Sequence, residues 1–173
     1  MNGFPEIQPA AAGGVSTEPA PILVLGLGNL LLSDDGVGPA VLQQLANSSA
    51  RWPKEVEFVD GGTQGLALLA QFDGRRAVII VDALQTGAPP GTVHRLTLNE
   101  LRAMAGPRAN SAHEGNAGEL LAAAQLLGEL PDRLFIVGVE PECLSTGFAL
   151  SDTVKQAIPN VLDQISSLLS QLS

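Results

Sequence analysis

Residues 21–46 constrain the fold of this chain more than any other stretch, because they combine a buried-strand signal, a glycine turn, two acids and a helix start. Ile22 to Leu25 is a continuous apolar run, which is typical of a parallel strand covered on both faces. Gly26-Leu27-Gly28-Asn29 follows it and allows a tight turn. The acids Asp34 and Asp35 then precede an apolar stripe with helical spacing. We therefore expect two carboxylates beyond the carboxyl end of a strand, where open α/β sheets bind ligands.

The pattern of an apolar run followed by an acid recurs along the chain. The later runs, each with the residues that follow it, are Val56 to Val59 with Asp60-Gly61-Gly62-Thr63, Ala77 to Val81 with Asp82, and Leu134 to Val139 with Glu140. Helices are predicted between the strands at Gly36 to Ala46, Gln64 to Gln71, Leu98 to Ala105 and Ala117 to Gly128. This alternation predicts a three-layer α/β fold, with a mainly parallel twisted sheet and helices on both faces.

Two segments complete this architecture. Thr92 to Leu96 alternates apolar and polar residues, which indicates an edge strand with His94 facing solvent. From Ser151 onward, apolar residues at steps of three and four predict a long amphipathic helix, with Ser151 as its cap. We expect Pro159 to interrupt and kink this helix.

Composition narrows the classes of function. The 9 Lys and Arg against 18 Asp and Glu give a net charge of −9, which argues against a nucleic-acid partner. No apolar run approaches the roughly 20 residues that cross a bilayer, so we expect no membrane association. The single cysteine excludes an internal disulfide and favours a cytoplasmic location. Residues 1–20 are predicted to be a flexible amino-terminal segment, and residues 21–173 a single α/β domain.

Acids at the ends of several parallel strands are expected to gather at one edge of the sheet. Carboxylates held a few ångströms apart repel each other by roughly 1 to 4 kcal/mol per pair, which a bound cation relieves. His113, in a polar loop, supplies a nitrogen ligand, and two carboxylates with one imidazole suit a zinc-like or nickel-like ion. Ordinary structural roles compete with this interpretation. Asp34 is expected to cap a helix or to be solvated, Asp60 to form a turn, and Glu140 can equally be an exposed acid.

Several familiar sites are excluded by spacing. Leu31 stands where a dinucleotide-binding fingerprint needs its third glycine, and no phosphate-binding loop with Lys followed by Ser or Thr occurs. The sequence after His113 lacks the second histidine of a zincin helix, at the position of Ala117. No Gly-x-Ser-x-Gly elbow occurs either, and Cys143 has no activating histidine near it in the sequence, so a serine or cysteine nucleophile is only weakly supported.

From about Ile22 to Leu169 the chain resembles the hydrogenase maturation endopeptidases, which remove the C-terminal extension from the large subunit of nickel-iron hydrogenases. The segments that carry the resemblance are Gly26-Leu27-Gly28-Asn29 through Asp34-Asp35-Gly36-Val37-Gly38, Asp60-Gly61-Gly62-Thr63, Ile79-Ile80-Val81-Asp82-Ala83, Ser111-Ala112-His113 and Val137-Gly138-Val139-Glu140-Pro141. The resemblance implies a five-stranded sheet between helices, with Thr92 to Leu96 as one antiparallel edge strand.

The resemblance also implies the site and its partner. The metal-contacting and catalytic positions of the family fall on Asp35, Asp82 and His113, and the metal is nickel already held by the hydrogenase large-subunit precursor. Another divalent metal such as zinc or cadmium is expected to occupy such a site in a crystal. The residues expected to contact substrate are Gly28, Asn29, Asp60, Gly61, Gly62 and Thr63.

We therefore expect a cytoplasmic, monomeric endopeptidase that acts after nickel insertion, of either aspartyl or metal-dependent type. A non-catalytic metal-binding or nucleotide-binding module, such as a metallochaperone, is an alternative. A third is a hydrolase of small substrates that holds its own zinc.

Overall fold

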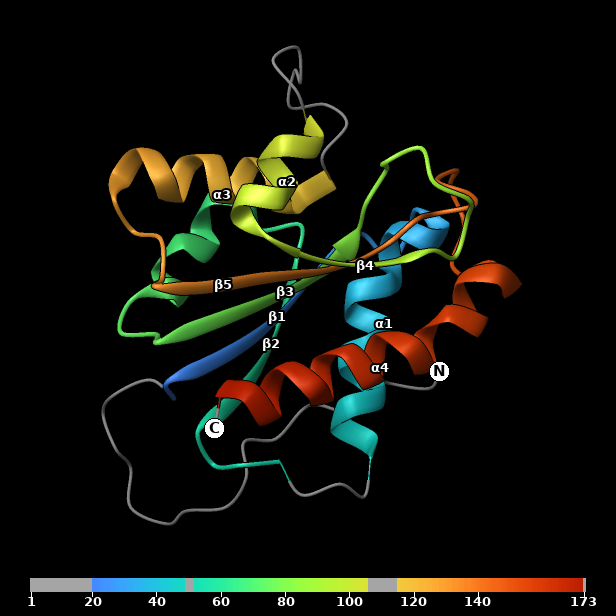
Figure 1. Ribbon diagram of the computed structural model, residues 1–173. Helices are drawn as coiled ribbons and strands as arrows, with labels where there is room; N and C mark the ends of the chain where they lie inside the picture. Colours follow the sequence, from blue (N-terminus) through green and yellow to red (C-terminus); the bar gives the residue numbers. More distant parts are fainter. Residues whose placement is uncertain (1–19, 49–51, 106–114, 173) are drawn as a thin grey trace.

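The computed structural model describes residues 20–48, 52–105 and 115–172 (Figure 1). Residues 1–19 of the predicted flexible segment therefore lie outside the described part. No helix in the described ranges is long and apolar enough to cross a membrane.

A five-stranded sheet forms the centre of the molecule. Its strands are β1 (Ile22–Leu27), β2 (Val56–Gly62), β3 (Ala77–Ala83), β4 (Val93–Thr97) and β5 (Arg133–Val139). They lie in the order β2-β1-β3-β5-β4, and every neighbouring pair is parallel except β4 with β5, which is antiparallel. The expected fold class is thereby confirmed, including the antiparallel edge strand.

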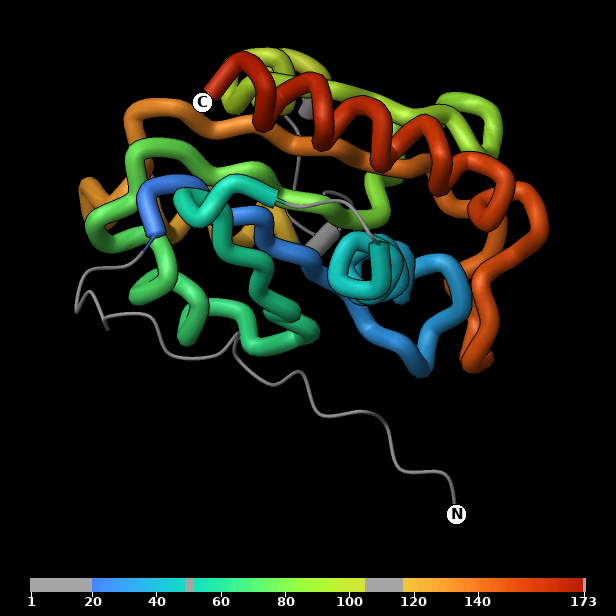
Figure 2. Tube along the Cα trace, turned by 90° about the horizontal axis from the view of Figure 1, so that it is seen from below, coloured from blue at the N-terminus to red at the C-terminus, as the bar shows by residue number. Residues whose placement is uncertain are grey.

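Helices cover both faces of the sheet (Figures 1 and 2). The helical segments are η1 (Ser33–Gly36), α1 (Val37–Asn47), η2 (Gly65–Phe72), α2 (Leu98–Ala105), α3 (Gly115–Leu127) and α4 (Asp152–Leu172), of which η1 and η2 are 3₁₀ helices. One apolar cluster joins α1 and α4 to one face, and a second joins η2, α2 and α3 to the other. The fold therefore has three layers.

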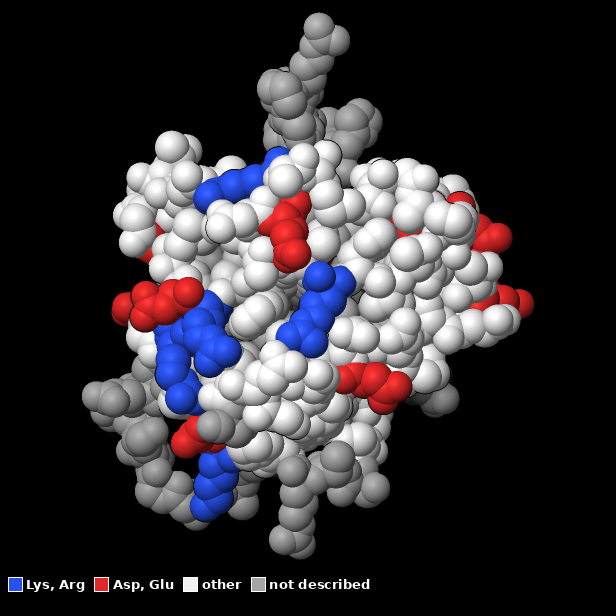
Figure 3. All heavy atoms as spheres, viewed as in Figure 1, with Lys and Arg blue, Asp and Glu red and all other residues white. Residues whose placement is uncertain are grey.

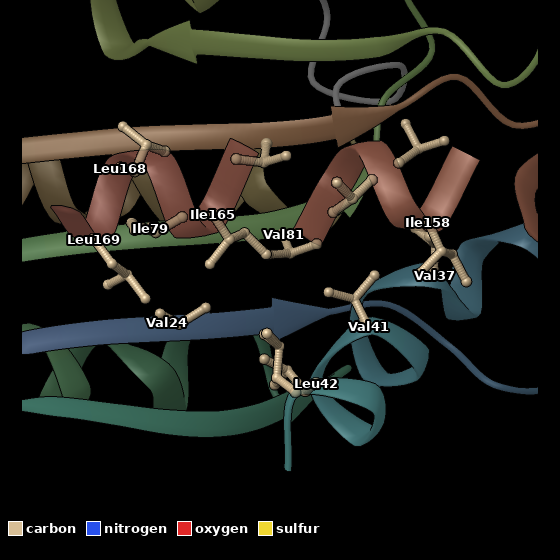
Figure 4. Packing of buried hydrophobic residues seen from close by; sticks show 14 of the residues in the cluster. Val24, Val37, Val41, Leu42, Ile79, Val81, Ile158, Ile165, Leu168 and Leu169 are labelled. Atoms are coloured by element: carbon tan, nitrogen blue, oxygen red, sulfur yellow. The ribbon is translucent and has the colours of Figure 1, made fainter. Parts of the chain in front are cut away.

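The alternation of side chains along β1 and β3 builds these two clusters. Val24 and Ile79 belong to the cluster with α1 and α4, whereas Leu25 and Ile80 belong to the opposite cluster. Figure 4 shows Ile165 and Leu168 of α4 facing the sheet, in the same cluster as Val41 and Leu42 of α1. Both strands are buried along their whole length because the two faces of a central parallel strand are covered.

The connections that leave β1 and β3 depart to opposite faces of the sheet. The chain after β1 enters α1, which packs on one face, while the path from β3 to β5 includes α3, which packs on the other. Neighbouring parallel strands whose connections diverge in this way leave a crevice at their carboxyl ends, and open α/β proteins bind ligands there. The ends of β1 and β3 are the places where Asp35 and Asp82 were expected.

Two details differ from the sequence expectation. The strands extend two or three residues further than their apolar runs, so Asp60 and Asp82 lie inside β2 and β3 rather than after them. This happens because backbone pairing with neighbouring strands continues past the last apolar side chain. The helix α4 runs without interruption through Pro159, whose side chain is exposed.

Candidate active site at the carboxyl edge of the sheet

Asp82 is a buried carboxylate at the centre of this edge. Its side chain has no exposure to solvent, and it lies near the end of β3. Oδ1 accepts a hydrogen bond from the Ala83 N–H at 2.9 Å, and Oδ2 accepts one from the Ala117 N–H at 2.8 Å. Ala117 is in the first turn of α3, so the positive end of that helix favours the ionised carboxylate. These bonds fix the carboxylate and tie α3 to the carboxyl end of β3.

Asp35 lies in η1, and its side chain is half-buried. Oδ2 accepts a hydrogen bond from the Asn29 N–H at 2.7 Å, which fastens the loop after β1. Gly28 makes this loop possible, because it has φ of +130° and a Cβ there would lie 1.7 Å from the Asp35 carbonyl oxygen. The glycine of the predicted turn is therefore needed for the close approach of two backbone segments.

The segment that carries Asp35 packs onto the end of β3. Residues of η1 contact β3, and the adjoining Gly38 touches both central strands. A Cβ at Gly38 would lie 2.1 Å from the Leu27 carbonyl oxygen and 2.7 Å from that of Val81. The absence of a side chain at Gly38 thus lets the start of α1 sit over the ends of β1 and β3, which brings the segment that carries Asp35 to the edge where Asp82 lies.

His113, the third expected ligand, lies outside the described residues. Within residues 20–48, 52–105 and 115–172, no group of three His, Cys, Asp or Glu side chains is placed to hold a metal ion. The predicted Asp-Asp-His set therefore stays a prediction.

Asp34 has a different role from the cap or solvated neighbour that the sequence suggested. Its carboxylate is completely buried. Oδ2 accepts hydrogen bonds from the N–H groups of Glu142 and Cys143, both at 2.9 Å, and from the Ser151 hydroxyl at 2.9 Å. Oδ1 accepts a further bond from the Ser151 N–H at 2.6 Å. Asp34 thus fastens both ends of the connection between β5 and α4 to η1, whereas its neighbour Asp35 bonds the loop after β1.

Asp60 forms the turn that one reading of the sequence predicted. Its Oδ1 accepts a hydrogen bond from the Gly62 N–H at 3.0 Å, and Gly62 has φ of +48°. The Gly62 carbonyl in turn accepts a bond from the Gly28 N–H at 3.1 Å. The glycine turns after β1 and β2 are therefore joined, which places both sets of expected substrate-contacting residues at one edge. Contact between these residues and a substrate stays a prediction.

Glu140 is buried rather than an exposed acid at a strand end, with only 5% of its surface accessible. Its carboxylate accepts hydrogen bonds from the Thr86 N–H, the Thr86 hydroxyl and the Gly87 N–H, at 2.8 to 3.1 Å. Burial alone would raise the pKa of the Glu140 carboxyl, but these bonds and the charge of His94 outweigh it, and the pKa lies below its usual value.

The expectation that His94 faces solvent is wrong. Its side chain is 15% exposed, its Nε2 lies 3.6 Å from Glu140 Oε2, and it also contacts the Thr86 hydroxyl at 3.2 Å. The alternation in β4 predicted the strand correctly, but the loop before β4 folds over the polar face and covers this imidazole. Local sequence carries no signal for either this cluster or the Asp34 network, because the partners are far apart in the chain.

Comparison with known proteins places the chain in a family. The hydrogenase maturation protease family matches residues 39–168, which is most of the described domain. The chain belongs to the hydrogenase maturation protease family. The match includes Asp60, Asp82 and His113 and begins just after Asp35. The family is one of peptidases, and the resemblance noted from the motifs is confirmed.

Individual members of the maturation protease family cover the domain more completely. The hydrogenase 2 maturation protease of Escherichia coli is 36% identical over 151 residues, which are 87% of this chain and 91% of that protein. The hydrogenase expression/formation protein HupD of Thiocapsa roseopersicina is 34% identical over 153 residues, 87% of this chain and 68% of its own length. The structure of the hydrogenase maturating endopeptidase HybD from E. coli superposes with a TM-score of 0.76 at 35% identity, covering 88% of this chain and 93% of that one.

Proposed function

We propose that this maturation protease removes the C-terminal extension of a nickel-iron hydrogenase large-subunit precursor after nickel has been inserted. Asp35, Asp82 and His113 contact the nickel that the precursor presents, and they bring the scissile peptide to it. The observation that supports the proposal is that η1, which carries Asp35, contacts β3, which carries the buried Asp82, in a chain of this family.

The two carboxylates differ in what they offer a metal. Asp82 is held rigidly by the Ala83 and Ala117 N–H groups. Asp35 uses Oδ2 for the Asn29 N–H, while its Oδ1 accepts no hydrogen bond from the described residues. Asp82 thus offers a fixed carboxylate and Asp35 a half-buried one, and this pair suits a metal that arrives with a protein substrate.

Chain length limits how far His113 can lie from Asp82. It is four positions before Ala117, whose N–H donates to the Asp82 carboxylate. An extended chain spans at most ~3.6 Å per residue, so four positions span no more than roughly 14 Å. This short separation in the sequence is the reason for including His113 in the proposed set.

Nickel held between substrate and protease accounts for the chemistry without a serine or cysteine nucleophile. A metal ion polarises a peptide carbonyl and lowers the pKa of a bound water, so that hydroxide is available for attack near neutral pH. The carboxylates and the imidazole orient the metal toward the scissile bond, and cleavage then depends on prior nickel insertion. Two carboxylates and an imidazole also form a donor set that zinc accepts.

The proposal is tested by incubating the protein with purified precursor, with and without nickel, and following loss of the terminal peptide on a gel. We expect conversion only of nickel-loaded precursor. Asp35→Ala, Asp82→Asn and His113→Ala should each lower the rate at least about a hundredfold, more than the loss of an outer partner of a metal ligand typically costs. Asp132→Asn, an exposed acid before β5 at the opposite edge, is the matched control and should convert precursor normally.

Normal conversion by the Asp82→Asn protein would rule out this site. Equal conversion of precursor with and without nickel would rule out the metal dependence while leaving the peptidase activity intact.

A further inference from the structure

Three large apolar side chains are exposed on two paired segments, one of which leads into η1. They are Leu30 at 51%, Leu31 at 53% and Phe148 at 86% of their full accessibility, and we call them the apolar rim. Leu30 and Leu31 come from the loop between β1 and η1, and Phe148 comes from the connection between β5 and α4. Exposed apolar side chains that gather from separate segments are typical of a binding surface.

Backbone hydrogen bonds hold the two segments of the rim together. The Gly147 N–H donates to the Leu31 carbonyl, and the Ser33 N–H donates to the Gly147 carbonyl, both at 2.9 Å. Figures 1 and 2 both show residues 29–36 running beside residues 140–151. The buried Asp34 carboxylate anchors the same two segments from beneath. The rim is therefore built into the folded chain and does not depend on a partner for its shape.

Acidic side chains outnumber basic ones around the rim. Glu142 is exposed, and Asp152 has 90% of its side chain exposed and pairs at 3.2 Å with Lys155, the basic residue beside them. By contrast, Lys54 and Arg76 precede β2 and β3, and Arg133 is the first residue of β5, so these three lie at the opposite edge. In Figure 3 the end of the molecule where these loops lie shows Asp and Glu side chains, whereas the visible Lys and Arg side chains lie toward the middle and left.

We infer that the apolar rim is a docking surface for a segment of the hydrogenase precursor that presents apolar side chains next to Lys or Arg. This inference rests on the proposed function, because the rim is continuous with the loop that carries Asp35. Charge complementarity selects this occupant. A second copy of the chain would bring the same acids together, and an anionic lipid surface would be repelled by them.

Docking is tested by measuring precursor binding and precursor conversion separately. The test protein carries Leu31→Ser with Phe148→Ser. The matched control carries Leu126→Ser with Leu127→Ser, which are 88% and 62% exposed at the far end of α3. Substitutions at such exposed positions leave the fold intact, and thermal unfolding of each protein verifies this.

We expect the rim variant to raise both Kd for immobilised precursor and KM for its conversion about tenfold or more, with kcat unchanged within about twofold. The control should match the wild type. Binding of the wild type should also weaken between about 50 mM and 300 mM salt, and Glu142→Gln should reduce that salt dependence.

A rim variant that binds as tightly as the wild type, or a control that is equally impaired, would overturn the inference. Concentration-dependent dimerisation that is lost in the rim variant would do the same, because the rim would then bind a second copy. If wild-type protein binds precursor through the rim but never shortens it, the docking surface holds and the proposed peptidase function fails.

Discussion

Replacing Asp34 with alanine removes a buried carboxylate that accepts four hydrogen bonds from the connection between β5 and α4. Three of the donors are backbone N–H groups, of Glu142, Cys143 and Ser151, and each buried donor left without a partner costs about 1 to 3 kcal/mol. Water can satisfy part of this loss because the connection is partly exposed. We therefore expect Asp34→Ala to lower the free energy of unfolding by about 3 to 5 kcal/mol, which corresponds to roughly 6 to 20 °C in Tm for a domain of this size.

Urea unfolding followed by Trp52 fluorescence measures this change, since Trp52 is the single tryptophan and packs edge-on against Phe58 at 5.6 Å. The matched control is Asp35→Ala, which removes the same chemical group one residue later. Asp35 is half-buried and, among the described residues, accepts only the bond from Asn29, so the control should lose only about 1 to 2 kcal/mol. Equal losses at the two positions would refute the division of the acidic pair into a structural and a functional member.

Two further variants test the loops around the crevice. Glu140→Gln should be most destabilising near pH 7, and the difference in unfolding free energy from the wild type should shrink as pH falls below about 4. The reason is that a carboxyl whose pKa is lowered in the folded state adds stability only above its unfolded pKa. Urea titrations across this pH range measure the difference, and a difference that does not depend on pH would contradict the ionised, hydrogen-bonded role of Glu140. Gly28→Ala should lower stability several times more than Gly65→Ala, because a Cβ at Gly28 meets the Asp35 backbone, whereas nothing lies within 4 Å of a Cβ at Gly65. Similar Tm values for the two proteins would show that the backbone moves to remove the clash at little cost.

The strands, and the acids near their carboxyl ends, were predictable because both depend on local sequence pattern. The wholly apolar runs that start β1 and β3 can be stable only between two helical layers, and that requirement fixes the fold class. Parallel strands then bring their carboxyl ends to one edge whatever their order. The expectation that Asp35 and Asp82 lie at the same edge therefore needed no knowledge of the neighbours of each strand.

The environments of the polar residues were not predictable, because they depend on contacts between distant segments. Asp34 and Asp35 are adjacent residues of the same type in the sequence. Only the return of residues 142–151 to η1 buries Asp34, while Asp35 stays half-buried. In the same way, His94 is covered because Glu140, 46 positions later, holds the Thr86 loop against it. Alternation in a strand reports which face a side chain is on and does not report what folds over that face.

Nickel X-ray absorption of the rapidly frozen complex between nickel-loaded precursor and this protein tests the central claim most directly. If the acids and the imidazole contact the metal, the wild-type complex should show oxygen or nitrogen neighbours of nickel that free precursor lacks, and Asp82→Asn should change that shell without abolishing binding. A nickel spectrum that is identical with and without the protein, under conditions where the precursor is bound, would contradict it.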